Sequence, residues 1–129
     1  MVHEQKTVLV VDDDSQINEL VGGYVELAGF PHHSVMNGAD ALQQIKTSCP
    51  ALILLDLMLP DVDGLEICRR LHADPNFSDI PIVILTALDK EECRREANAN
   101  GAVAYLTKPF DPDHLIRAIQ KWARVNPTS

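Results

Sequence analysis

The chain has 129 residues, 46% of them hydrophobic, which suits one globular domain with a real core and excludes a disordered segment. Its formal net charge of −8 argues against nonspecific binding to nucleic acid or to an anionic membrane, because both need clustered basic residues. The longest apolar runs are strand-sized, so no membrane span is expected. Three scattered cysteines and a polar N-terminal segment without a secretory signal indicate a cytoplasmic protein with reduced thiols.

Five short apolar runs alternate with segments of helical period, which is the pattern of an α/β protein with parallel strands. We expect strands at about residues 7–11, 30–36, 51–56, 82–86 and 103–107, and the second has the weakest pattern. Helices are expected from Asp14 or Ser15 to Gly29, from Asn37 to Cys49, after Gly64, at about residues 89–98, and after Asp111.

Two of these helices have unusual compositions. The first should bury one apolar face, made of Ile17, Leu20, Val21, Tyr24, Val25 and Ala28. Its adjacent glycines, Gly22 and Gly23, should each cost roughly 1 kcal/mol relative to alanine, and close packing of a neighbour would explain them. The fourth helix has Cys93 and Ala97 as its main inward candidates, so we expect it to shift easily.

Polar residues follow four of the predicted strands at the same end. The first strand leads into the acidic triplet Asp12 to Asp14, the third ends at Asp56, the fourth at Thr86, and the fifth leads into Lys108. In an open parallel sheet these ends lie side by side, at the edge where such folds bind their ligands. Read singly, the triplet is as easily a helix cap and Asp56 a turn residue, but the coincidence of four strand ends favours one shared site.

Crowded carboxylates at that edge would repel one another unless a cation compensated them. Mg²⁺ is the natural choice because it prefers oxygen ligands, and Lys108 would add a fixed positive charge. Asp56 could then act as a nucleophile, since aspartate is a known site of covalent phosphoryl attachment. Phosphoryl transfer depends mainly on positioning and charge neutralisation, which this set of residues can supply.

The sequence resembles the receiver domain of bacterial two-component response regulators, the CheY-like family, over nearly its whole length. The resemblance rests on VVDD ending at Asp13, LLDLMLPDVDG ending at Gly64, ILTA ending at Ala87 and YLTKPF beginning at Tyr105. It implies a flavodoxin-like (βα)5 fold with strand order 2-1-3-4-5 and helices on both faces of the sheet. Residues 1–129 would form a single receiver domain with an ordered core at about residues 6–125.

The resemblance also implies roles for individual residues. Asp56 would accept a phosphoryl group from a histidine kinase or a phosphotransfer protein. Mg²⁺, or Mn²⁺ as a substitute, would be bound by Asp13, Asp56 and the main-chain carbonyl of Met58, with Asp12 assisting through water. Lys108 and Thr86 would contact the phosphoryl group, and Lys108 would precede a cis proline.

Thr86 and Tyr105 resemble the switch pair of the family, in which the hydroxyl moves toward the phosphoryl group and the ring turns inward. The output surface would be the face built from the fourth helix, fifth strand and fifth helix, and the downstream effector is not specified. Regulators with winged-helix DNA-binding domains usually carry paired acids before this tyrosine, whereas this chain has Val103 and Ala104. We therefore expect a monomer or a weak phosphorylation-dependent dimer, with no nucleic acid bound by this domain.

Other functions remain open at this stage. An aspartyl-phosphate phosphatase of the haloacid-dehalogenase type would need a second acid two residues after the nucleophile, where this chain has Met58. A degenerate receiver would serve only as a docking module, although every expected site residue is present. The sequence does not distinguish a stand-alone receiver from a part of a longer regulator. Apolar Met58 and Leu88 beside the site also suggest a long-lived acyl phosphate, because they would hinder attacking water.

Overall fold

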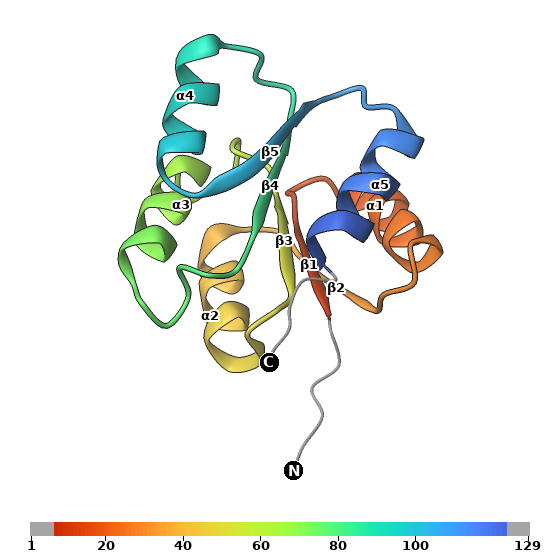
Figure 1. Cartoon of the computed structure of the whole chain (residues 1–129), viewed down its shortest axis with the longest axis horizontal. Coiled ribbons are helices and arrows are strands. Elements are labelled where there is room, and N and C mark those ends of the chain that lie inside the picture. The colour runs from red at the N-terminus through yellow and green to blue at the C-terminus, as the bar shows by residue number, and fades with distance from the viewer. Residues whose placement is uncertain (1–6, 124–129) are drawn as a thin grey trace.

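A computed structural model describes residues 7–123 as one five-stranded parallel sheet in the order β2-β1-β3-β4-β5, so the expected topology is confirmed (Figure 1). The strands are β1 (Val8–Val11), β2 (His32–Val35), β3 (Leu52–Leu55), β4 (Ile82–Thr86) and β5 (Ala102–Thr107). The helices are α1 (Ser15–Leu27), α2 (Gly38–Ser48), α3 (Gly64–Ala73), α4 (Glu91–Ala99) and α5 (Pro112–Ala123). Residues 6, 124 and 125 of the expected core, and the polar N-terminal segment, lie outside the described range.

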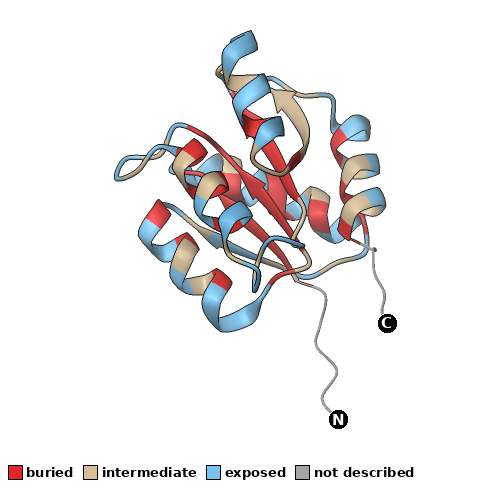
Figure 2. Ribbon diagram, turned by 60° about the vertical axis from the view of Figure 1, so that its left-hand side comes forward, coloured by how far each residue is buried: buried red, intermediate tan, exposed pale blue. Residues whose placement is uncertain are grey.

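Helices cover both faces of the sheet: α2, α3 and α4 lie on one side, and α1 and α5 on the other (Figure 1). Strand residues alternate between the two resulting cores, so that Leu9 and Val11 face α2 and α3 while Val8 and Val10 face α1 and α5. Figure 2 shows the buried central strands between partly exposed helices. This double burial explains why the strands read as unbroken apolar runs.

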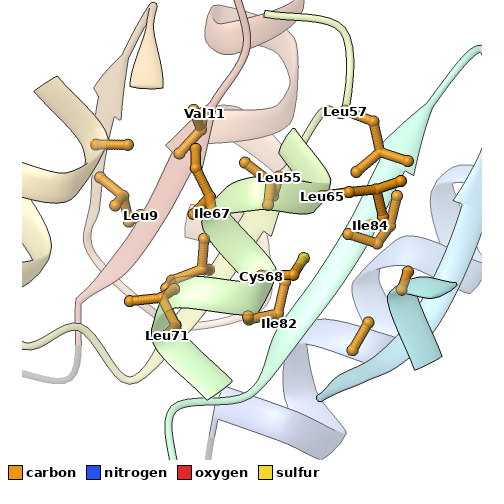
Figure 3. Close-up of a cluster of buried hydrophobic side chains, with 14 of the residues drawn as sticks. Leu9, Val11, Leu55, Leu57, Leu65, Ile67, Cys68, Leu71, Ile82 and Ile84 are labelled. Carbon is orange, nitrogen blue, oxygen red and sulfur yellow. The ribbon is translucent and has the colours of Figure 1, made fainter. Parts of the chain in front are cut away.

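The core beneath α3 is the one drawn in Figure 3, where Ile67, Cys68 and Leu71 of the helix pack onto the strands. Cys68 is fully buried, and this burial raises the pKa of its thiol to about 12. The thiol is therefore protonated at neutral pH and acts as a small apolar side chain. Cys49, Cys68 and Cys93 are all free, as expected.

In α1, the buried face and one of the two glycines differ from the sequence-based expectation. Leu20 was placed on the buried face but is 47% exposed, whereas Asn18 is buried with 4% exposure. The guess of a close neighbour is confirmed for Gly22, because a Cβ there would lie 2.4 Å from Nε2 of His32. Nothing lies within 4 Å of the equivalent point on Gly23, so packing does not explain that glycine.

Few side chains of α4 are buried, which agrees with the weak packing expected for it. Ala97 is buried and Cys93 is half-buried, while the N-cap residue Lys90 makes no side-chain capping hydrogen bond. Surface ion pairs supplement this packing, with Arg69 of α3 bonded to Glu96 and Arg94 bonded to Asp89 at 3.2 Å. Between residues 7 and 123, no helix is long and apolar enough to cross a bilayer.

Candidate phosphoacceptor and metal site

The ends of four strands meet at the carboxyl edge of the sheet because their registers are aligned. Val11 pairs with Leu55, and Thr86 pairs with Thr107. Two backbone hydrogen bonds continue this alignment one residue further. The amide of Asp56 donates to the carbonyl of Val11 at 3.0 Å, and the amide of Lys108 donates to the carbonyl of Thr86 at 2.9 Å. Polar side chains separated by up to 96 positions in the sequence are thereby brought together.

Asp56 lies at the centre of this group and accepts hydrogen bonds on both carboxylate oxygens. Its Oδ1 accepts from the Thr86 hydroxyl at 2.7 Å and from the backbone amide of Met58 at 3.0 Å. Its Oδ2 lies 2.9 Å from Nζ of Lys108, which also lies 2.6 Å from Oδ2 of Asp12. Asp12 and Asp56 are 3% and 5% exposed, so water screens these ion pairs little.

Oxygens of Asp12, Asp13 and Asp56 lie within 4.8 Å of one another, and Asp13 is the exposed member. Hard oxygen donors at this spacing suit Mg²⁺ or Mn²⁺. Three carboxylates and the single ammonium of Lys108 leave a formal charge of −2, which one divalent cation would neutralise. The donor set therefore fits the expected metal in both chemistry and charge.

Burial and ion pairing act against each other on the pKa values of this cluster. Burial raises the pKa of Asp12, and the hydrogen bond from Lys108 offsets this only in part. For Lys108, burial lowers the pKa, but hydrogen bonds to Asp12 and Asp56 outweigh it and the net shift is upward. Lys108 is thus firmly protonated and provides a permanent positive charge beside Asp56.

The acidic triplet is divided in the structure: Asp14 caps a helix, whereas Asp12 and Asp13 lie in the cluster with Asp56. Asp14 is the N-cap of α1, and its Oδ1 accepts from the amides of Gln16 and Ile17 at 2.9 and 3.4 Å. Asp12 turns inward, where its Oδ1 accepts from the amide of Asp14 at 2.9 Å. The cap fixes the start of α1 directly after the two acids that line the site.

The loop after Asp56 is compact, and Gly64 at its end allows this by close packing. A glycine that ends a turn, such as Gly64, commonly adopts a positive φ angle, but positive φ angles among the described glycines occur at Gly29 and Gly101. A Cβ on Gly64 would instead lie 2.6 Å from Cα of Leu57 and 2.8 Å from the carbonyl oxygen of Asp56. Glycine is required there by close backbone approach, which keeps the loop folded against the end of β3.

The same loop is tied to α2 through Asp61. Its carboxylate accepts from the backbone amides of Gly38 at 2.8 Å and Ala39 at 3.0 Å. These two bonds, the first from Gly38, lower the pKa of Asp61. Asp61 therefore supplements the N-cap Asn37 from a different part of the chain.

Tyr105 is half-buried, and its hydroxyl donates to the carbonyl of Leu88 at 2.8 Å. The guanidinium of Arg94 lies 4.7 Å from the centre of its ring. Burial is the main cause of the raised pKa of the phenol. In the sequence, Arg94 and the adjacent Arg95 both look like solvated helix residues, and no signal distinguishes them. The peptide between Lys108 and Pro109 is cis, as the resemblance implied.

Strand order and the placement of acids at the carboxyl edge put the chain in the flavodoxin-like class of α/β proteins. Comparison with known proteins gives the family. The model of the response regulator receiver domain matches residues 8–120, so the chain belongs to that family.

Curated relatives are transcriptional regulators by name. The chain is 40% identical over 115 residues to the phosphate regulon transcriptional regulatory protein PhoB of Pseudomonas aeruginosa, covering 89% of this chain and 50% of that protein. It is 38% identical over 117 residues to the DNA-binding dual master transcriptional regulator RpaA of Synechocystis sp., covering 91% of this chain and 48% of RpaA. The chain thus spans about half the length of these relatives.

Solved structures agree in fold. A Francisella response regulator receiver domain matches with a TM-score of 0.84 and 34% identity, over 92% of this chain and 97% of that one. A DrrB receiver domain described as BeF3-activated matches with a TM-score of 0.83 and 28% identity, over 95% of this chain and 100% of that one. The Mn²⁺-bound form of the response regulator Rcp1 matches with a TM-score of 0.74 and 26% identity, over 92% of each chain.

Proposed function

We propose that this domain is a phosphorylation-activated switch of a two-component system, with Asp56 as the phosphoacceptor. The observation that carries the proposal is the arrangement of Asp56, whose oxygens lie 2.9 Å from the Lys108 amine and 2.7 Å from the Thr86 hydroxyl. A carboxylate held this way is nucleophilic yet flanked by groups that can neutralise incoming phosphate.

In the proposed reaction, a carboxylate oxygen of Asp56 attacks the phosphorus of a phosphohistidine on a histidine kinase or phosphotransfer protein. A P–O bond forms, the P–N bond breaks, and the imidazole leaves and takes up a proton. Lys108 would pair with one phosphoryl oxygen, and the Thr86 hydroxyl would donate to another. Both groups already contact Asp56, so they need only small movements.

Mg²⁺ or Mn²⁺, when bound, would neutralise phosphoryl charge as the new bond forms. We assign Asp13 and Asp56 and the main-chain carbonyl of Met58 as ligands, with Asp12 acting through water. The Mn²⁺-bound form of Rcp1 supports a divalent cation in this fold, and the BeF3-activated DrrB domain supports a phosphoryl-like group.

The signal would leave through the face formed by α4, β5 and α5. Thr86 is hydrogen-bonded to Asp56, and Tyr105, on the neighbouring strand, is hydrogen-bonded to Leu88 two residues after Thr86. Added phosphoryl charge at Asp56 would therefore act directly on the loop that precedes α4. The weakly packed α4 is the element most easily moved, and the receiver of the signal would be an effector protein or domain.

The test is phosphorylation by acetyl phosphate and MgCl₂, with the modified residue mapped by mass spectrometry. We expect wild-type protein to gain one phosphoryl group on Asp56 and Asp56→Asn to gain none while keeping its fold, because the substitution is nearly isosteric. Thr107→Ser is a suitable control, since it retains a hydroxyl at the end of β5. Labelling at another residue, or equal labelling of Asp56→Asn, would refute the assignment, and absence of labelling in wild type would favour a docking module.

A further inference from the structure

Asn18 of α1 is a buried amide that touches the site without belonging to its reactive groups. The residue is 4% exposed, and its Nδ2 donates to the carbonyl of Asp12 at 2.8 Å and to that of Val35 at 3.3 Å. Because both partners are carbonyl oxygens, the NH₂ group must be the atom that faces them, so the orientation of the amide is fixed. Asn18 thus joins α1 to the ends of β1 and β2.

The bond to Asp12 acts at the point where the sheet no longer holds the chain. The amide of Asp12 donates to Val35 at 3.2 Å, which is the last backbone bond between β1 and β2. The carbonyl of Asp12 belongs to the peptide that links Asp12 and Asp13. Its bond to Asn18 fixes the plane of that peptide, and with it the directions in which the two carboxylates leave the backbone.

Packing alone does not account for an amide at this position. Within residues 7–123, Oδ1 of Asn18 is buried and has no hydrogen-bond partner, which is unfavourable in a core. A leucine of similar size would fill the space without this cost. The property that leucine lacks is the pair of donors directed at the strand ends.

We propose that Asn18 is a positioning residue for the divalent cation: it sets the geometry of Asp12 and Asp13 through the carbonyl of Asp12. This inference rests on the proposed function, because it assumes that these acids bind the metal. It assigns no contact between Asn18 and the cation. The effect of Asn18 on the cation is indirect, as for other residues that orient metal ligands by hydrogen bonds without binding the metal themselves.

The test compares Mg²⁺ affinity in wild type, Asn18→Leu and Val25→Ala, by titrating MgCl₂ and following the backbone amide of Met58 by NMR. Val25 is a fully buried residue of the same helix, so Val25→Ala lowers stability without touching the strand ends. Urea unfolding establishes that each variant is folded under the conditions of the titration. This control separates loss of positioning from general loss of stability.

We expect the dissociation constant to rise about tenfold in Asn18→Leu and to stay unchanged in Val25→Ala, in line with the effects of other residues that orient ligands. A value for Asn18→Leu within about threefold of Val25→Ala would overturn the inference, and a larger rise supports it. Failure of wild type to bind Mg²⁺ would instead contradict the metal in the proposed function.

A second measurement needs no variant and remains informative if Asn18→Leu does not fold. Coupling between two sites is reciprocal, so if the Asn18 bonds favour metal binding, metal binding must favour those bonds. We expect saturating MgCl₂ to slow hydrogen exchange of the Asn18 side-chain amide in wild type. Exchange at the same rate with and without MgCl₂ would count against the positioning role.

Discussion

Gly64→Ala should destabilise the domain because the new methyl group would meet backbone. The added Cβ would lie 2.6 Å from Cα of Leu57, 2.8 Å from the carbonyl oxygen of Asp56 and 3.1 Å from Cδ2 of Leu57. Neither backbone atom can rotate away, so the loop itself must shift. Insertion of a methyl group into a packed site typically costs about 1–3 kcal/mol.

Urea unfolding measures this cost directly. A loss of about 2 kcal/mol, divided by an m-value of about 2 kcal/mol per molar, lowers the unfolding midpoint by about 1 M. The matched control is Gly23→Ala, which makes the same substitution in the interior of α1 with nothing within 4 Å of the new atom. That variant should be more stable than wild type by up to about 1 kcal/mol, because alanine favours helix. Equal midpoints for Gly64→Ala and wild type would refute the steric argument.

Further predictions concern the site and its surroundings. Met58→Asn and Leu88→Asn should each shorten the lifetime of the phosphorylated protein, because polar side chains would admit and orient attacking water. The rate of autodephosphorylation measures this lifetime, and an unchanged rate would count against shielding by the apolar side chains. The lowered pKa of Asp61 means that its contribution to stability is present above the ordinary pKa of about 3.9 and is lost as the pH falls through the lowered value. Asp61→Asn should therefore make urea midpoints depend less on pH in that acidic range, and an unchanged profile would contradict the assignment. Arg94→Ala should speed amide hydrogen exchange in α4 because it removes a stacked cation and an ion pair, whereas Arg95→Ala should not; equal rates in both variants would oppose this role.

Much of the fold could be predicted because the central strands β1, β3 and β4 are buried on both faces, which leaves a plain signal in the sequence. The prediction of β2 was the weakest because this strand is not buried on both faces. It lies at the edge of the sheet, and its central residues His33 and Ser34 are exposed. A strand with so little buried surface carries little apolar pattern.

Which face of α1 is buried could not be predicted from the spacing of its hydrophobic residues alone. Leu20 and Asn18 both lie near the edge of the apolar stripe, and hydrophobicity alone favours burying the leucine. The structure buries Asn18 because the helix begins directly after the site acids, which places residue 18 against the ends of β1 and β2. That choice depends on a hydrogen bond to backbone carbonyls, and side-chain hydrophobicity carries no information about it.

The positions of the site charges suggest how metal and phosphate would approach. Lys108 contacts the two buried acids, Asp12 and Asp56, whereas Asp13 and Met58 are exposed at the opening of the site. Asp13 would therefore help to hold a cation from the exposed side of the cluster, while Lys108 contacts the buried acids. A phosphoryl group on Asp56 would then be compensated by two positive charges, and removal of either should leave its negative charge poorly compensated. We accordingly expect Lys108→Met to retain Mg²⁺ binding through Asp13 and Asp56 in a MgCl₂ titration, but to lose the effect of phosphorylation on Thr86.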